Sequence, residues 1–283
     1  MKSFTNKDIE NYYDQSEVHY RIFWKLKKSM GLHYGIWNKD TKNLADAVLN
    51  TNKMLMELGG IKSIDLMLDA GCGIGGSSIY VSKNTGCNVI GISLSKKQVN
   101  TATGLAKEYN LSDKIHFYQK DYTATGFDDN TFDIVWAIES MQTAKDKSLF
   151  YKEISRILKP GGKLLMADVF KPQGYNIDDE KDMQVMLNGW AMSDILSLDE
   201  FKKLAAEYSF DVTTLQDVSN EVKKSVDKIY IASILGMFGT FAYNLFRKAT
   251  YFSRIHYTTG LAQKKAYYNG KWGYYLVACV NKK

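Results

Sequence analysis

The stretch Asp69-Ala70-Gly71-Cys72-Gly73-Ile74-Gly75-Gly76 decides the fold of this chain. It lies between an apolar segment at 64–68, which predicts a strand, and residues 77–81, which predict the start of a helix. A glycine-rich turn between a strand and a helix brings bare backbone close to a nucleotide-like ligand. Glycine suits this position because it tolerates a sharp turn and has no side chain that blocks close approach.

Asp69 stands two residues before the first glycine, at the carboxyl end of the predicted strand. A carboxylate there disfavours a pyrophosphate and accepts a ligand that carries an ammonium group. S-adenosylmethionine carries both an ammonium and a sulfonium. The stretch therefore resembles the first motif of the class I methyltransferases that use this donor, Asp/Glu-x-Gly-x-Gly-x-Gly. A structural alternative is a tight turn in which Asp69 accepts hydrogen bonds from local amides.

A second reading of the glycines predicts an NAD(P)-dependent oxidoreductase. Gly71, Gly73 and Gly76 also fit the dinucleotide fingerprint G-x-G-x-x-G. That fingerprint expects an acidic residue about 20 positions later, at the end of the second strand. Here the second strand, predicted at 87–93, ends in Ser93-Leu94-Ser95 without an acid. The sequence therefore favours the methyl donor over a nicotinamide cofactor.

The composition predicts a globular protein that needs neither disulfide bonds nor structural metals for stability. A chain of 283 residues with 45% hydrophobic content suits one domain with an insertion, or two small domains. Its three cysteines and four histidines are scattered, so neither a disulfide framework nor a metal site is expected. The net charge of +6 is spread along the chain, which is typical of a solvated surface and offers mild attraction for an anionic substrate. No motif indicates nucleic-acid binding.

The first residues show no apolar core and no cleavage site of a secretory signal, so we expect a cytoplasmic protein. An uncharged run at 230–246 contains small and polar residues. It is shorter than the roughly 20 apolar residues that a membrane span needs. The run therefore predicts a buried or interfacial helix.

Strand and helix patterns alternate from residue 63 onward. The alternation predicts a parallel sheet that is covered by helices on both faces. A sixth strand and a closing strand complete an α/β, Rossmann-like sheet of seven strands, as in class I methyltransferases. The predicted strands are 64–69, 87–93, 115–119, 132–138, 163–169, 211–216 and 274–280, with helices at 95–109 and 146–158 and a turn at 160–162.

This pattern divides the chain into three expected parts. Residues 1–60 form an N-terminal helical cap, and residues 61–170 form the Rossmann-like core that binds S-adenosylmethionine. Residues 171–283 complete the sheet and carry a helical substrate-binding lid at about 171–197 and 220–265.

Loops that follow successive strands are expected to assemble the donor site, because ligands bind beyond the carboxyl ends of such strands. Gly71 and Gly73 let the backbone meet the amino-acid part of the donor. The next loop resembles the Ser-Leu-Ser-x-x-Gln variant of lipid-modifying and sterol-type methyltransferases, which places Ser93 and Gln98 at the donor's ribose. Ser95 and Gln98 also fit a capping box, which is a common helix start.

The third loop contributes Asp121 and Tyr122. The resemblance implies that Asp121 accepts a hydrogen bond from the adenine amino group and that Tyr122 flanks the adenine ring. The alternative for Asp121 is an ordinary turn residue.

The fourth strand ends in Ile138-Glu139-Ser140, where the resemblance sharpens to the tocopherol, sterol and isoprenoid C-methyltransferases. Sarcosine and phosphoethanolamine N-methyltransferases are their cousins. The resemblance implies that Ile138 contacts the donor and that Glu139 removes a proton or stabilises positive charge. Many relatives carry a histidine four residues after the glutamate, and Thr143 stands there instead. The alternative for Glu139 is a structural carboxylate that caps the next helix.

Residues 11–14 (NYYD) and 32–37 (LHYGIW) also match this group. The resemblance implies that Tyr13 contacts the donor and that Trp37 lines the same side, towards the acceptor. The alternative is plain aromatic packing.

The aromatic segment between residues 230 and 275 is the part that bears on the acceptor. Such density most often belongs to a core. It also suits an apolar acceptor, because aromatic faces stabilise a carbocation formed when an alkene is methylated. Arg247, Arg254 and Tyr257 are predicted acceptor contacts, and the cations suit a diphosphate or acidic head group. Solvated surface is the rival explanation for these cations.

The sequence therefore predicts an S-adenosylmethionine-dependent methyltransferase of a small lipophilic acceptor, such as an isoprenoid, a sterol or a prenylated compound, with C-methylation favoured. No metal is expected. An N-methyltransferase of a small amine, of the sarcosine or phosphoethanolamine type, is the alternative within the class, and an NAD(P)-dependent oxidoreductase is the alternative outside it. Peripheral contact with a membrane and self-association are further expectations.

Overall fold

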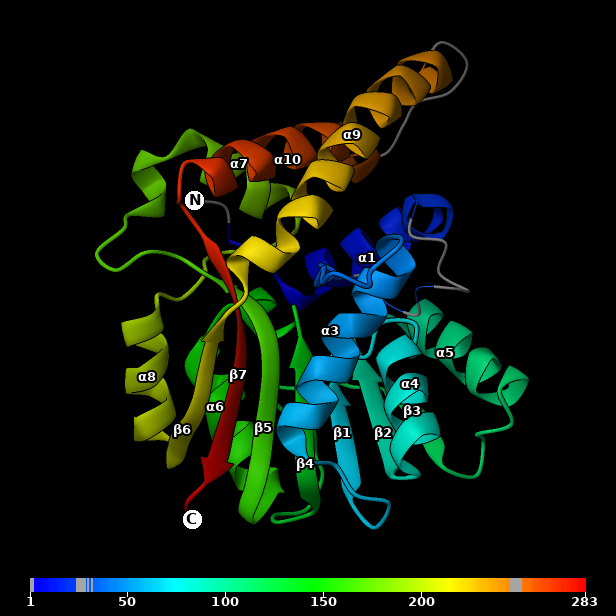
Figure 1. The fold of residues 1–283 in the computed structure, drawn as a ribbon, viewed down its shortest axis with the longest axis vertical. Coiled ribbons are helices and arrows are strands. Elements are labelled where there is room, and N and C mark those ends of the chain that lie inside the picture. The colour runs from blue at the N-terminus through cyan, green and yellow to red at the C-terminus, as the bar shows by residue number, and fades with distance from the viewer. Residues whose placement is uncertain (1–2, 24–28, 30, 32, 245–250) are drawn as a thin grey trace.

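A seven-stranded mixed sheet forms the centre of the structure, a computed structural model that describes residues 3–23, 29, 31, 33–244 and 251–283 (Figure 1). The strand order is β3-β2-β1-β4-β5-β7-β6. The first five strands are parallel, and β7 runs antiparallel to both β5 and β6. The predicted fold class is confirmed. The strands are β1 (Leu66–Ala70), β2 (Asn88–Ser93), β3 (Ile115–Gln119), β4 (Phe132–Ile138), β5 (Leu158–Phe170), β6 (Phe210–Asp217) and β7 (Gly273–Asn281).

Helices cover both faces of the sheet because neighbouring strand residues point to opposite sides. Met67 belongs to one buried cluster, which contains side chains of three helices that cover the sheet and of three more beyond its carboxyl end. Leu68, the next residue, belongs to a second cluster that contains side chains of two other helices. The first face carries α3 (Leu44–Gly59), α4 (Gly76–Thr85) and α5 (Lys96–Glu108), and the second carries α6 (Lys147–Ile157) and α8 (Leu198–Glu207).

Helix α3 packs on the sheet although it falls within the predicted cap at 1–60, and the division of the chain into three parts stays a prediction. Gly59 lies so close to the sheet that a Cβ there would be 2.3 Å from Leu165 Cδ1. Lys163 Nζ donates to Gly59 O at 2.7 Å. The Asn43 side chain caps the start of α3, and Gly60, with a left-handed backbone, ends it. The tertiary contact assigns this helix to the sheet layer.

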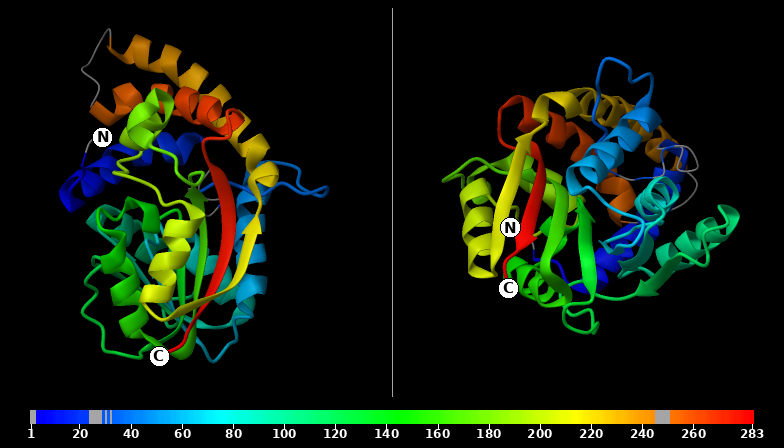
Figure 2. Two further views of the ribbon diagram at one scale, coloured as in Figure 1. Left: turned by 90° about the vertical axis from the view of Figure 1, so that its left-hand side faces the viewer. Right: turned by 60° about the horizontal axis from the view of Figure 1, so that its bottom comes forward.

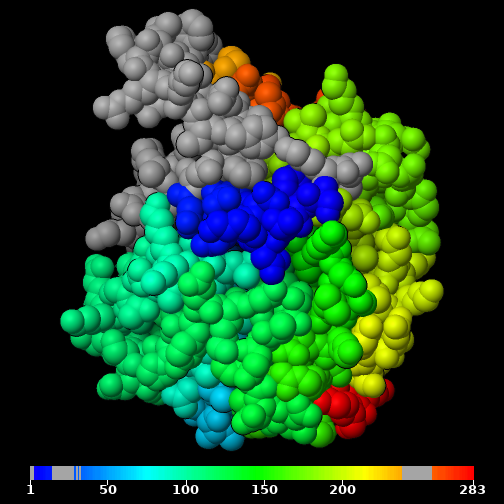
Figure 3. All heavy atoms as spheres, turned by 180° about the vertical axis from the view of Figure 1, so that it is seen from behind, coloured from blue at the N-terminus to red at the C-terminus, as the bar shows by residue number. Residues whose placement is uncertain are grey.

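The remaining long helices lie over the carboxyl ends of the parallel strands (Figures 1 and 2). Seen from behind, the blue N-terminal segment lies on the green surface of the sheet domain (Figure 3). Two hydrogen bonds hold α1 there, from Asn6 Nδ2 to Asp121 Oδ2 at 2.6 Å and from Ser95 Oγ to Asp14 Oδ1 at 2.5 Å. These helices are α1 (Asn6–Phe23), α7 (Lys181–Gly189), α9 (Ser219–Asn244) and α10 (Tyr251–Tyr268).

One predicted turn is wrong. Residues 160–162 lie within β5, which begins at Leu158. The pairing of β4 with β5 shifts register between Phe132 and Ile134, and Gly161 has a φ of +76°. A β-bulge accommodates the glycines without ending the strand.

None of the helices in the described part of the chain is long and apolar enough to cross a membrane.

Candidate active site

The glycine loop after β1 is pressed against the end of β4. Gly71 has a φ of +101°, and a Cβ there would lie 2.4 Å from Ser140 Cβ. Ser140 Oγ donates to Ala70 O at 2.6 Å, which ties the two strand ends together. A side chain at position 71 would force these strands apart.

Gly73 faces open space beside an amide. Its φ is +51°, and the nearest atom to a Cβ built there is Gln98 Nε2, at 4.0 Å. Gln98 Oε1 accepts from Ser93 Oγ at 2.7 Å, which fixes the orientation of the amide. Ser95 Oγ accepts from Gln98 N at 3.1 Å and caps α5, so capping and the predicted ribose contact of Gln98 are compatible. The structure therefore brings Gly73, Ser93 and Gln98 together, as predicted.

Asp69 is turned into the protein. Its side chain is buried, and Asp69 Oδ2 accepts from Ser78 Oγ at 2.6 Å. Burial raises the pKa of Asp69 to about 7, although hydrogen bonds from Ser78 oppose this rise. These contacts fix the first turn of α4, which is the structural role weighed for this residue. The contact of Asp69 with a ligand ammonium stays a prediction.

The two predicted residues of the third loop lie in different surroundings. Asp121 lies beneath α1, and its carboxylate accepts from Asn6 and from Thr123 N. Tyr122 points into the core, with its ring 5.4 Å from that of Phe150 and its hydroxyl donating to a backbone carbonyl. The buried ring packs on α6 as part of the core, and the contact of Tyr122 with the adenine ring stays a prediction. The contact of Asp121 with adenine stays a prediction.

Glu139 has a strained backbone and a carboxylate held by two donors. Its φ of +48° is uncommon for a residue other than glycine, and such strain gathers at functional sites. Glu139 Oε1 accepts from Tyr34 N at 2.6 Å and from Tyr274 OH at 2.8 Å. Burial raises the pKa of Glu139 to about 8, and Asp168 adds to the rise. Because these donors lie on distant segments, the carboxylate is not a helix cap.

The two residues that donate to this carboxylate belong to a cluster of aromatic rings. The Tyr34 ring lies 6.0 Å from that of Trp190, 5.3 Å from that of Trp272 and 5.5 Å from that of Tyr274. Burial, and to a smaller extent the charge of Glu139, raises the pKa of the Tyr13 hydroxyl. The contact of Tyr13 with the donor stays a prediction.

Sequence reasoning missed Tyr34 and Tyr274 as partners of Glu139. Tyr34 belongs to the matched segment 32–37, which is a signal that could have found it. Tyr274 is 135 residues from Glu139 and begins an ordinary closing strand, so the sequence carries no local signal for it.

Trp37 lies elsewhere, against α9. Its indole Nε1 donates to Ser225 Oγ at 2.9 Å, and Lys224 Nζ and Lys228 Nζ are each 5.5 Å from its ring. The backbone amide of Tyr34, three residues earlier, donates to Glu139 instead.

The predicted acceptor contacts of the lid stay predictions. Arg247 and the side chain of Arg254 lie outside the described residues. Tyr257 is half-buried on α10.

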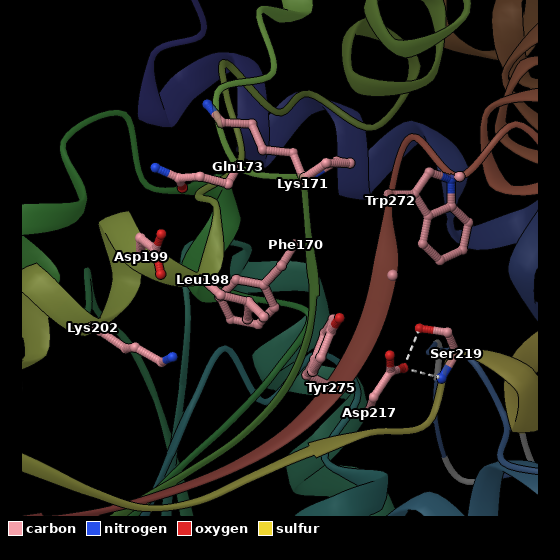
Figure 4. A pocket seen from close by; sticks show the side chains of 13 residues that line it. Phe170, Lys171, Gln173, Leu198, Asp199, Lys202, Asp217, Ser219, Trp272 and Tyr275 are labelled. Carbon is pink, nitrogen blue, oxygen red and sulfur yellow. Dashed lines mark hydrogen bonds between the residues drawn. The ribbon is translucent and has the colours of Figure 1, made fainter.

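A separate pocket of about 400 Å³ opens over the ends of β5, β7 and β6 (Figure 4). Its lining includes Phe170, Lys171, Leu198 and Tyr275 and none of the predicted site residues. Trp272 lines this pocket and also packs on Tyr34. This member of the ring cluster therefore also borders the pocket.

Asp168, at the end of β5, is a fully buried carboxylate. Asp168 Oδ1 accepts from Val169 N at 2.9 Å, and Oδ2 has no hydrogen-bond partner among the described residues. Burial raises the pKa of Asp168 to about 7, against an opposing effect of Lys147. Because the folded state binds this proton more tightly than the unfolded chain, the stabilisation is complete below about pH 4 and lost as the pH rises through about 7.

We expect Asp168→Asn to remove this pH dependence. Between about pH 5 and about pH 8, the free energy of unfolding of the wild type should fall relative to that of the variant, by at most about 1.4 kcal/mol per pH unit. Urea unfolding of both proteins at these two pH values measures the difference. A constant difference would show that Asp168 is ionised throughout.

Comparison with known proteins agrees with this geometry. A family profile described as "Methyltransferase domain" matches residues 68–166. The 27-O-demethylrifamycin SV methyltransferase of Amycolatopsis mediterranei is 30% identical over 200 residues, which cover 70% of this chain and 72% of that protein. The 2-methyl-6-phytyl-1,4-hydroquinone methyltransferase of Synechocystis is 35% identical, covering 66% of this chain and 56% of that protein.

A sterol 24-C-methyltransferase of Saccharomyces cerevisiae is 28% identical over 77% of this chain, which spans 58% of the yeast protein's length. Among solved structures, the [4+2]-cyclase SpnF has a TM-score of 0.82 at 20% identity, covering 99% of this chain and 97% of that one. A geranyl diphosphate methyltransferase has a TM-score of 0.79 at 20% identity, covering 98% and 99%. These two structural likenesses concern the fold alone. The sequence matches, together with this fold, show that the chain belongs to the family of class I, S-adenosylmethionine-dependent methyltransferases.

Proposed function

We propose that this protein transfers the methyl group of S-adenosylmethionine to a carbon atom of a small lipophilic acceptor that contains an alkene. Glu139 takes the final proton or balances the positive charge that forms on the acceptor. The observation that carries this proposal is the position of Glu139, a partly buried carboxylate that accepts from Tyr34 and Tyr274, two members of a cluster of aromatic rings.

The ring cluster supports an alkene acceptor. Methylation of an alkene forms a carbocation, and aromatic faces attract a cation by about 2 kcal/mol or more when water is excluded. The centre of the Tyr34 ring lies within 6.0 Å of the ring centres of Trp190, Trp272 and Tyr274. A positive charge beside Glu139 also favours its ionised form, the form that can accept a proton.

The loops after β1 and β2 fit the methyl donor. Gly73 leaves open space above its Cα, and Gln98 presents its amide at the border of that space. An amide there can hydrogen-bond to ribose hydroxyls. When bound, S-adenosylmethionine supplies an activated methyl group, so the task of the protein is to align the acceptor with it and to exclude water.

Methyl transfer to a small amine is the second candidate, because one observation also favours it. A carboxylate beside aromatic rings binds ammonium groups as well as carbocations. In that case Glu139 would orient a neutral amine nitrogen. The relatives with alkene-bearing acceptors in their names favour the first candidate, since a 35% identical relative is a methyltransferase of a phytyl hydroquinone.

An acceptor screen with labelled S-adenosylmethionine tests the proposal. We expect transfer to at least one prenyl or sterol acceptor, such as geranyl diphosphate or a prenylated hydroquinone, and none to sarcosine or phosphoethanolamine. Mass spectrometry of the product should locate the new methyl group on carbon. Transfer to the amines alone would overturn the proposal in favour of the second candidate.

An anionic head group on the acceptor, held by Arg247 and Arg254, stays part of the proposal. The diphosphate arm of the screen addresses it. Self-association and a cytoplasmic location stay predictions.

A further inference from the structure

The outward face of α9 carries cations near the sheet and aliphatic side chains further out. Lys224, Lys228, Ile231 and Leu235 fall on one face of the helix, because their spacing of three and four residues follows the helical period. All four are exposed, Ile231 by 55% and Leu235 by 67%. Exposed aliphatic side chains adjacent on one helix mark an interaction surface.

The opposite face of α9 is the one that packs against α10. A Cβ on Gly260 of α10 would lie 1.8 Å from Ser233 Oγ, so the two helices touch there. Further out, Leu235, Gly236 and Met237 are exposed in succession. Three successive helical residues cover more than half of the circumference. The outer part of α9 therefore projects from the body, as Figures 1 and 2 show.

The side chains along α9 are arranged in the order expected at a membrane interface, with tryptophan and lysine first and aliphatic residues further out. Trp37 lies at the base of the face, with Lys224 Nζ and Lys228 Nζ each 5.5 Å from its ring. Leu235 is about 10 Å further along the axis than Lys228, at about 1.5 Å per residue. Tryptophan and lysine prefer the head-group level of a bilayer, and aliphatic side chains prefer the level below it.

The charge of the C-terminal part of the chain has one sign. No aspartate or glutamate follows Asp227. The segment that follows carries seven cations before the last strand, Lys228, Arg247, Lys248, Arg254, Lys264, Lys265 and Lys271, of which the last three are paired with Asp227, Asp182 and Glu180. Anionic lipids attract such a segment by about 1 kcal/mol for each cation near the surface.

We propose that the outer part of α9 docks on an anionic lipid bilayer, with Ile231 and Leu235 in the head-group and acyl boundary and Lys224 and Lys228 at the phosphates. A bilayer fits better than a protein partner because it can surround a projecting helix, whereas a protein covers one face. The absence of a spanning helix among the described residues fits a peripheral mode of binding. None of Lys224, Lys228, Ile231 and Leu235 is a proposed contact of the methyl donor or acceptor, so the proposal does not depend on the identity of the acceptor.

Flotation of the full chain with vesicles tests the proposal. We expect binding to vesicles of phosphatidylcholine mixed with phosphatidylglycerol, weaker binding to phosphatidylcholine alone, and loss of part of the affinity at high salt. Ile231→Glu and Leu235→Glu together should lower the affinity for the mixed vesicles by about tenfold or more, because they remove apolar contact and add repulsion.

The matched control is Ile64→Glu. Ile64 is 85% exposed but precedes β1, at the opposite end of the sheet, so this substitution adds one negative charge, half the change of the double variant, to an exposed isoleucine away from α9. It should leave vesicle binding unchanged, and neither protein should lose its fold, because all three positions are exposed. The proposal is overturned if the wild type binds neither kind of vesicle. It is also overturned if the double variant binds the mixed vesicles as tightly as the control variant does. Conversion of a wild-type dimer to a monomer by the double variant, without lipid, would assign the face to self-association instead.

Discussion

Glu139→Gln should lower kcat by about 100- to 10,000-fold, the range typical of a lost general base, while the protein still binds S-adenosylmethionine. Glutamine keeps the size of the side chain and can still accept from Tyr34 N and Tyr274 OH, so the local structure should persist. It loses the negative charge, which both proposed roles of Glu139 require. Initial rates on the acceptor found in the screen, together with calorimetric titration of the donor, measure the two effects.

The pH profile sharpens this test. Burial raises the pKa of Glu139 to about 8, so kcat of the wild type should rise as the pH approaches that value from below. The rise should be absent in the residual activity of Glu139→Gln. Tyr274→Phe removes one of the two donors and keeps the charge, so it should cost less than the loss of Glu139. Equal activity of wild type and Glu139→Gln would exclude Glu139 from the chemistry.

Gly71→Ala should destabilise the fold by about 3 kcal/mol or more, because it combines two costs. The φ of +101° disfavours any side chain, and the new Cβ would lie 2.4 Å from Ser140 Cβ. Since Ser140 Oγ also binds Ala70 O, the clash cannot be relieved without moving a buried strand end. Urea unfolding at one pH, with wild type in parallel, measures the loss.

Gly161→Ala separates the two costs. Gly161 has a φ of +76°, and a Cβ there meets no atom within 4 Å, so only the backbone cost of about 1 kcal/mol remains. If Gly71→Ala and Gly161→Ala lower the free energy of unfolding equally, the contact with Ser140 does not contribute to the loss. Gly73→Ala should resemble Gly161→Ala in stability, because only Gln98 Nε2 lies within 4.0 Å, yet it should weaken donor binding.

Asp69 shows how a correct family can follow from an incomplete argument. The sequence argument held that an anion at a strand end selects a cationic donor. In the structure, the Asp69 carboxylate is buried and bound to Ser78, where it fixes the turn that presents Gly73. The motif still identified the family, because the spacing of acid and glycines describes a loop shape as well as a ligand contact.

Local patterns determined the sheet. Alternating strands and helices predicted all seven strands, because the side-chain periods of two and 3.6 residues are written in the sequence. The packing of α3 on the sheet and the bulge in β5 were not predicted, because both depend on contacts with distant strands. Gly59 meets Leu165 across more than a hundred residues, and no local signal records that contact.

The sequence by itself determined the fold class, the glycine loop and Glu139 as the central carboxylate, because each rests on residues close together in the chain. Tertiary structure alone decided the surroundings of that carboxylate. Tyr34 and Tyr274, 240 residues apart, meet at Glu139 because an antiparallel closing strand brings the end of the chain beside β5. The pKa of a side chain, a cluster of rings and an exposed helix face all depend on which residues are neighbours in space. Residues that are far apart in the sequence give no local signal of such contacts.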